Sequence, residues 1–266
     1  MNFFKKLFKK DIEKEIDEKI KHFVKKHGKT KEIKELSEIT KEDRLKDDFF
    51  DIIFKLSYTS NKRKRKELTA KAELIASKIP GLKGWPRDSK KFWDVEAYAW
   101  LGKIPRRIRE FIRKELMKRI PLGTLNLGIG SGSYPYIEDS VLLDLSREML
   151  KLVTPVKSKA KIEYDLEKGK LPFQDNSFDS VTMVFVIDYL KNLKQVLKET
   201  KRILKKNGKL ILVNSKKPID SWYRKHEVKH YTRKEIKLLL KQIGFKVKIE
   251  EKKIDKIVLL FVEGIK

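Results

Sequence analysis

Three glycines at alternating positions, Gly128, Gly130 and Gly132, follow the strand-like run TLNL. Glycine tolerates positive φ, and it lets the backbone approach a ligand where a Cβ atom would clash. Two acids come next along the chain, because Asp144 ends the strand-like run VLLD and Asp165 ends the run IEYD. A carboxylate at a strand end accepts hydrogen bonds from both hydroxyls of a ribose. Glycines and acids in this order predict a nucleoside site.

The expected elements bring these residues together. Ligands of open parallel sheets bind at the carboxyl ends of the strands, so Asp144 would hold the ribose and Asp165 would reach an adenine amino group. A fourth piece, QDNSFDSVTMVFVIDYL, indicates a polar turn and a buried strand that ends at Asp188 and Tyr189. A lone G-x-G-x-G pattern is weak, whereas four pieces in this order are specific.

At these residues the chain resembles the class I S-adenosylmethionine-dependent methyltransferases, in the branch of the ubiquinone/menaquinone-type and related "type 11" enzymes. LNLGIGSGS is similar to their first motif, LLDLSREML to their ribose-binding strand end, and DLEKGKLPFQDNSFDSV to their most distinctive stretch. The resemblance runs from about Leu122 to Lys266 and implies S-adenosylmethionine as the cofactor. The cofactor-binding residues that it implies are Asn126, Gly128, Gly130, Gly132, Asp144, Leu145, Asp165 and Leu166.

Two departures from the family pattern stand out. The family usually has Asp or Glu where this chain has Asn126, a residue that helps hold the methionine ammonium. Asparagine accepts a hydrogen bond but brings no charge, which puts the cofactor affinity in question. The segment SYPYIEDS after the glycines is also too short for the usual full helix, so we expect one turn at most.

The predicted fold is α/β, a Rossmann-like seven-stranded class I methyltransferase sheet with an added helical N-terminal region. By resemblance, the last two strands form an antiparallel hairpin. We expect a basic helical region over 1–120, which binds the acceptor or caps the site, and a methyltransferase domain over 121–266. The expected strands lie near 124–129, 140–144, 161–165, 178–185, 208–214, 245–251 and 256–263. The expected helices of the sheet domain lie near 146–153, 192–206 and 232–243, and apolar stripes predict N-terminal helices around 12–24, 41–60 and 64–79.

Charge is concentrated before the predicted sheet. The net charge is +27, and residues 51–120 hold 20 basic and 8 acidic side chains. A polyanionic partner such as RNA, bound through 51–120, is one interpretation, and a solvated lysine-rich surface is the other. The chain has no cysteine, which excludes disulfides, thiolate metal sites and cysteine nucleophiles.

No apolar run approaches the length of a membrane span, and no signal peptide is visible, so we expect a cytoplasmic protein. The basic start MNFFKKLFKK either rests on an anionic membrane surface or packs its phenylalanines on the body.

Aromatic and basic residues alternate over GLKGWPRDSKKFWDVEAYAWLGKIPRRIREFIRK, which holds three of the four tryptophans, Trp85, Trp93 and Trp100. Aromatics interleaved with arginines stack bases and hold phosphates. The same residues would serve as a cap over a small-acceptor pocket, or as core that anchors this region to the sheet. The sequence leaves these alternatives open.

The candidate catalytic residues are Asp188, Tyr189 and His230. Methyl transfer requires a base only if the acceptor must lose a proton, and Asp188 is the best candidate unless it caps the next helix. His226 and His230 match the zinc motif H-E-x-x-H, but they lie in an expected loop with no third ligand, so we expect no metal site. His230 fits better as a lid or acceptor contact.

The sequence thus predicts an S-adenosylmethionine-dependent methyltransferase that acts on a small organic molecule or an RNA. The absence of an Asn/Asp-Pro-Pro-Tyr motif argues against amide or exocyclic-amine methylation by the usual route of that motif. The alternative is an RNA-binding protein with a degenerate, non-catalytic methyltransferase fold.

Overall fold

The computed structural model describes residues 41–153, 158–217 and 229–266 and divides the chain into two compact units, Met1–Pro80 and Gly81–Lys266. The expected helix at 12–24, the basic start of the chain and His226 lie outside the described residues. In the first unit, α3 (Lys41–Tyr58) and α4 (Lys62–Ala76) pack together, close to the two helices expected there. The side chain of Asn61 starts α4 by accepting a hydrogen bond from the backbone N–H of Lys64.

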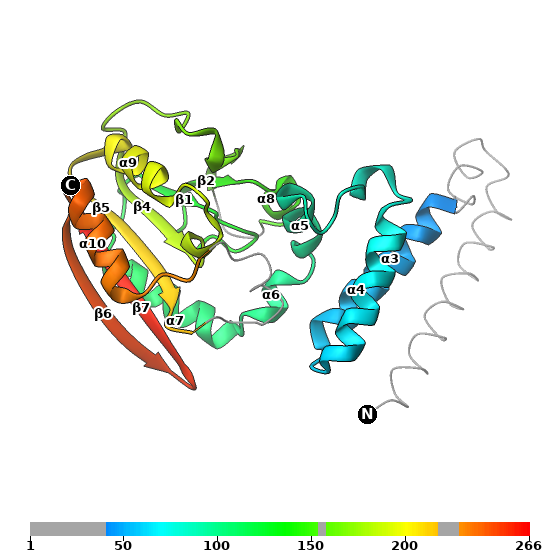
Figure 1. The fold of residues 1–266 in the computed structure, drawn as a ribbon. Coiled ribbons are helices and arrows are strands. Elements are labelled where there is room, and N and C mark those ends of the chain that lie inside the picture. Colours follow the sequence, from blue (N-terminus) through cyan, green and yellow to red (C-terminus); the bar gives the residue numbers. More distant parts are fainter. Residues whose placement is uncertain (1–40, 154–157, 218–228) are drawn as a thin grey trace, which may run out of the picture. The chain divides into compact units, whose positions relative to one another are not determined.

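The second unit contains a seven-stranded sheet with the order β3-β2-β1-β4-β5-β7-β6 (Figure 1). Neighbouring strands are parallel except β7, which is antiparallel to both β5 and β6. The strands are β1 (Asn126–Ile129), β2 (Ser140–Asp144), β3 (Ser158–Glu163), β4 (Phe178–Val184), β5 (Leu204–Ser215), β6 (Lys246–Ile254) and β7 (Ile257–Ile265). This sheet confirms the predicted fold class, including the antiparallel final pair.

Helices connect and cover the strands. They are α5 (Ser89–Glu96), α6 (Trp100–Lys103), α7 (Arg106–Met117), α8 (Arg147–Lys151), α9 (Leu193–Ile203) and α10 (Arg233–Ile243), with short 3₁₀ turns η1 (Pro80–Leu82), η2 (Leu166–Lys168) and η3 (Ile187–Tyr189). Local sequence sets the ends of α10, where Thr232 and Glu235 form a capping box and Gly244 adopts the left-handed conformation. No helix occurs between Gly130 and Ser140, which confirms the expectation for this short segment.

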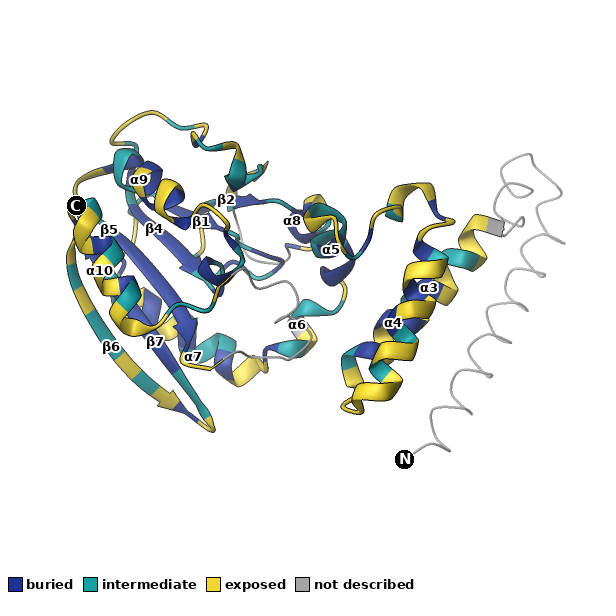
Figure 2. Ribbon diagram, viewed as in Figure 1, coloured by how far each residue is buried: buried dark blue, intermediate teal, exposed yellow. Residues whose placement is uncertain are grey.

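Both faces of the sheet are buried, and the alternation of side chains along β5 shows how. Leu210 and Leu212 belong to a core shared with α9 and α10, whereas Ile211 and Val213 pack with α7. Successive strand residues point to opposite faces, so a run of apolar residues feeds two cores. Figure 2 shows the central strands buried and the edge strand β6 partly exposed.

The structure places the division of the chain after Pro80 rather than at residue 120. The apolar face of α7, formed by Ile108, Ile112 and Leu116, packs against the sheet core. Residues 81–120 are therefore part of the unit that holds the predicted cofactor site.

None of the helices in the described ranges combines the length and apolar character that crossing a membrane requires.

Candidate cofactor and acceptor site

A cavity of about 980 Å³ lies where β1, β2, β3 and β4 end. Six of the eight expected cofactor residues line it: Gly130, Gly132, Asp144, Leu145, Asp165 and Leu166. The other two, Asn126 and Gly128, line a separate pocket of about 20 Å³ together with Gly130. The volume of the large cavity is at the upper end of the range for small-molecule sites, roughly 300–1,000 Å³.

The glycine turn brings bare backbone to the cavity wall. Gly130 and Gly132 have φ values of 57° and 59°, which side-chain-bearing residues rarely adopt. A Cβ atom on Gly130 would also lie 2.5 Å from Cγ2 of Val186, so the side chain of Val186 would have to move. Both conformation and space therefore favour glycine at 130, and the backbone is free to approach a ligand.

Asp144 closes β2 beside this turn. One carboxylate oxygen accepts a hydrogen bond from the backbone N–H of Gly132 at 2.8 Å, and the other accepts from Ser146 N–H at 2.9 Å. Burial raises the pKa of Asp144 to about 6, against the lowering effect of these hydrogen bonds. Each oxygen keeps a further lone pair, so the side chain can accept the two hydroxyls of a ribose on the cavity side.

Asp165 lies two residues after β3, which ends at Glu163 and not at 165 as expected. Its side chain accepts a hydrogen bond from Glu167 N–H at 2.9 Å and starts the turn η2, while the residue lines the cavity. Leu145 and Leu166 add apolar wall on the same side. The glycine turn, the two acids Asp144 and Asp165 and this apolar wall thus line one cavity, and their chemistry fits S-adenosylmethionine.

Asn126 lies inside the sheet, where its amide is fully engaged. The side-chain NH2 donates to Ser140 Oγ at 2.9 Å and lies 3.3 Å from Thr182 Oγ1, and the amide oxygen accepts from Ser180 Oγ at 3.0 Å. The residue is 1% exposed. Where the family usually has an acid, this chain has an asparagine whose amide is hydrogen-bonded to hydroxyl groups of the neighbouring strands β2 and β4.

Aromatic side chains form a further part of the cavity wall. The ring of Trp93 meets Trp100 at a centroid distance of 5.5 Å and Tyr189 at 5.0 Å, in both cases edge to face. Arg109 also lines the cavity, with its guanidinium 5.2 Å from the Tyr134 ring centroid. Of the tryptophans singled out in the sequence, Trp93 and Trp100 are therefore wall residues, and Trp85 is buried core at 4% exposure.

The helix α5, which carries Trp93, is linked by polar contacts to the residues that follow β2 and to the end of β3. Asp94 accepts a hydrogen bond from Ser146 Oγ at 2.7 Å, and Lys90 lies 3.0 Å from Glu163 at the end of β3. Sequence periodicity does not reveal these links, because the partners are more than fifty residues apart. The alternation of aromatic and charged residues was the available signal.

Asp188, the candidate base, does not line the cavity. Its carboxylate accepts hydrogen bonds from Asn214 Nδ2 at 3.0 Å and Tyr231 N–H at 3.2 Å, and its second oxygen lies 2.8 Å from His230 Nδ1. It does not cap α9 either, since Asn192 occupies the N-cap position there. Of the three candidate catalytic residues, the cavity wall includes Tyr189 but neither Asp188 nor His230.

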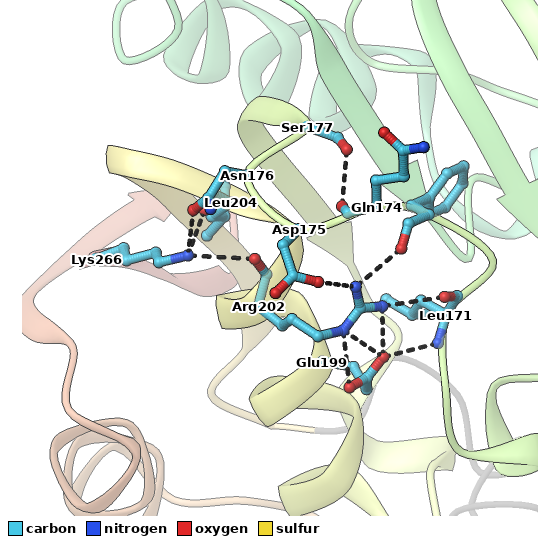
Figure 3. A network of polar contacts seen from close by, with 10 residues as sticks. Leu171, Gln174, Asp175, Asn176, Ser177, Glu199, Arg202, Leu204 and Lys266 are labelled. Atoms are coloured by element: carbon cyan, nitrogen blue, oxygen red, sulfur yellow. Dashed lines mark hydrogen bonds and ion pairs between the residues drawn. The ribbon is translucent and has the colours of Figure 1, made fainter.

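The most distinctive sequence stretch, LPFQDNSFD, forms a loop held by one arginine (Figure 3). Arg202 of α9 donates to the carbonyl oxygens of Leu171 and Phe173 and to Asp175 Oδ1, at 3.1, 2.8 and 2.7 Å. Glu199 binds the same guanidinium and accepts Leu171 N–H at 2.9 Å. The stretch therefore has a structural role, and it leads the chain into β4.

No group of three or more metal-binding side chains is found in the described ranges.

The comparisons with known proteins agree with this geometry. The family described as "Methyltransferase domain" matches residues 125–212. The uncharacterized protein MJ1123 of Methanocaldococcus jannaschii is 32% identical over 147 residues, which is 49% of this chain and 68% of that protein.

Solved structures of methyltransferases share the fold, and two of them serve as examples. One is a chain of the complex that contains the Trm112 methyltransferase activator of Haloferax volcanii, with a TM-score of 0.54 and 19% identity over 65% of this chain and 96% of that one. The other is phosphoethanolamine N-methyltransferase 2 of Haemonchus contortus with S-adenosylhomocysteine, with a TM-score of 0.55 and 15% identity over 67% of this chain and 58% of that one. The chain belongs to the class I S-adenosylmethionine-dependent methyltransferases, in the type 11 branch, and its cofactor is S-adenosylmethionine.

Proposed function

We propose that this protein catalyses the transfer of a methyl group from S-adenosylmethionine to an acceptor that enters the same cavity beside Tyr189. The observation that carries the proposal is the lining of this cavity. The glycine turn, Asp144 and the aromatic side chains of Trp93, Trp100 and Tyr189 all line this one cavity.

S-adenosylmethionine supplies a methyl group that is already activated, so the residues of the chain have to orient the reactants and exclude water. Asp144 and Asp165 would fix the nucleoside. The perpendicular rings of Trp93, Trp100 and Tyr189 form a rigid apolar surface for the acceptor.

Asp188 and His230 act as positioning residues in this proposal. Asp188 joins η3 to the end of β5 and to the residues before α10 through Asn214, Tyr231 and His230. Since Tyr189 is the next residue in the chain, these contacts would set the position of its ring at the cavity wall.

The acceptor is a small organic molecule or a group on an RNA, such as a base turned into the cavity. Both classes fit a site with aromatic walls, and the basic charge of 51–120 favours RNA.

The alternative of a degenerate, non-catalytic fold was based on two features, Asn126 and the short segment after the glycines. Asn126 lies outside the large cavity with its amide satisfied, and Tyr134 and Tyr136 of the short segment line the cavity. Neither departure therefore removes a wall of the site, and the catalytic proposal is favoured.

The proposal is tested in two steps. Titration calorimetry with S-adenosylhomocysteine should show one site per chain, and absence of both heat and a thermal shift would support the degenerate fold. Incorporation of tritiated methyl groups is then screened in total RNA and in small-metabolite extracts. Label in neither pool, from protein that binds the cofactor, would contradict methyl transfer to these acceptor classes.

A further inference from the structure

Two exposed aromatic rings lie at the end of α3. The side chains of Phe54 and Tyr58 are 56% and 72% exposed, although the neighbouring residues Ile53 and Leu56 are buried. The two rings contact each other, with centroids 4.9 Å apart and planes inclined by 54°. They form a small aromatic surface in solvent, one helical turn long.

Positive charge surrounds this pair. From Lys55 to Lys66 the chain has six basic residues and no acid, and five of them form the consecutive run 62–66 at the start of α4. Lys55 pairs with Asp51 and Arg63 with Glu67. Lys62, Lys64 and Lys66 are exposed, and no carboxylate of the described part of the chain pairs with them.

The turn between the two helices brings the rings and the lysines together. Only residues 59–61 separate Tyr58, the last residue of α3, from Lys62, the first residue of α4. We propose that Phe54, Tyr58 and the lysines at 62, 64 and 66, here named the hairpin tip, bind unpaired RNA. Bases would stack on the rings while the lysines hold phosphates.

A membrane surface fits these residues less well. An interfacial helix presents a continuous apolar face to the lipid. In this unit the apolar side chains Ile52, Ile53 and Leu56 of α3 and Ala72 and Ala76 of α4 are buried instead. What remains exposed at the tip is two rings among cations, which matches a chain of bases and phosphates. Figure 2 shows exposed residues along the length of α4, with a few buried ones between them.

The inference names the partner of the proposed reaction and in that respect rests on the proposed function. RNA binding is nevertheless measured without methyl transfer. The probe is a fluorescein-labelled single-stranded RNA of about 16 nucleotides, within the length covered by known single-strand sites. Binding to the full chain is followed by fluorescence anisotropy over a range of salt concentrations.

Three changes are compared. Tyr58→Ala removes one ring. The triple variant Lys62→Gln/Lys64→Gln/Lys66→Gln removes the charges of the tip, and Lys234→Gln/Lys237→Gln/Lys241→Gln removes the same charge from exposed lysines of α10. Cations in the first turn of a helix oppose its dipole, so the tip variant should fold at least as well as the wild type.

Tyr58→Ala should weaken RNA binding about tenfold and leave heparin, a polyanion without bases, unaffected. The tip variant should bind RNA at least about tenfold more weakly. The slope of log affinity against log salt concentration should become shallower by about 2, which corresponds to three phosphate contacts on a single strand. The α10 variant should bind RNA like the wild type.

Equal losses in the two triple variants would mean that diffuse charge binds the RNA, and the inference would fail. It would also fail if Tyr58→Ala changed nothing, or if vesicles of phosphatidylglycerol and phosphatidylcholine were bound through Tyr58 while RNA was not. Calorimetry with S-adenosylhomocysteine on each variant separates the two proposals. A wild type that binds RNA through the tip but not this ligand would contradict the methyltransferase function alone.

Discussion

The carboxylate of Asp144 accepts a hydrogen bond from the backbone N–H of Gly132 at 2.8 Å. This contact joins the end of β2 to the glycine turn after β1, so the predicted ribose acceptor and the predicted backbone cradle form one unit. Because the carboxylate is buried, its pKa of about 6 has consequences for both stability and cofactor binding.

The stability consequence follows from the direction of this shift. The pKa of Asp144 is higher in the folded protein than in the unfolded chain, so the folded state holds the proton more tightly between about pH 4 and pH 6. The free energy of unfolding should therefore fall by up to about 3 kcal/mol over that range and then level off. Asp144→Asn removes the titration, so the stability difference between wild type and variant should shrink with rising pH in urea unfolding. Parallel pH curves for the two proteins would refute the assignment.

Cofactor binding should respond to the same proton in the opposite direction. The ionised carboxylate accepts hydroxyl groups better than the protonated one, so the affinity for S-adenosylhomocysteine should rise as pH increases through about 6. We expect Asp144→Asn to weaken binding at neutral pH at least about tenfold, with little pH dependence. Asp255→Asn, an exposed acid paired with Arg107, is the calorimetric control and should bind normally.

The glycine turn allows a matched comparison of two glycines. Gly130→Ala and Gly132→Ala both place a side chain at positive φ, which costs about 1–2 kcal/mol. The Cβ atom at 130 would also meet Val186 at 2.5 Å, whereas at 132 the nearest atom is Trp100 Nε1 at 3.7 Å. Urea unfolding should show the larger loss for Gly130→Ala. If the clash with Val186 causes the larger loss, Gly130→Ala should cost less stability in a Val186→Ala background than in the wild type. An equal cost in both backgrounds would exclude the clash as the cause.

The loop over 171–175 should depend on Arg202. Arg202→Gln removes hydrogen bonds to two carbonyl groups and two carboxylates, and we expect it to lower the free energy of unfolding by about 3 kcal/mol. Arg107→Gln, which removes an exposed arginine paired with Asp255, should change it by less than about 1 kcal/mol. Similar effects of the two substitutions in chemical denaturation would show that the loop contacts add little.

Asp188→Asn separates positioning from base catalysis. The substitution replaces one carboxylate oxygen of Asp188 with an NH2 group, which cannot accept the hydrogen bonds that neighbouring N–H groups donate. The melting temperature and the rate of methyl transfer should therefore fall together. Affinity for S-adenosylhomocysteine should stay unchanged, because Asp188 does not line the cavity. Loss of turnover with unchanged melting temperature and a shifted pH profile of the rate would instead identify Asp188 as the base.

Local signals in the sequence predicted much of the fold. The run VLLD became β2 within its expected bounds, and α10 (Arg233–Ile243) agrees with the helix expected near 232–243. The glycines and acids were placed at the correct sheet edge because the carboxyl ends of parallel strands meet there. Such features depend on neighbouring residues or on the alternation of strands and helices.

Contacts between distant segments were not predictable in the same way. Asp188 meets His230 and Asn214 only once η3, β5 and the start of α10 have come together. The division after Pro80 was also missed, because α7 is rich in basic residues but buries one apolar face against the sheet. Charge along the sequence marked the region as basic without showing which of its helices carry core residues.

The division after Pro80 also bears on how the protein could be reshaped. The α3–α4 hairpin belongs to the unit Met1–Pro80, whereas every residue that lines the cavity comes from Arg87 onward. An exchange of the α3–α4 hairpin for another hairpin would leave every residue of the cavity wall unchanged. If the hairpin tip binds RNA as proposed, such an exchange would alter the RNA that is bound without changing the cavity.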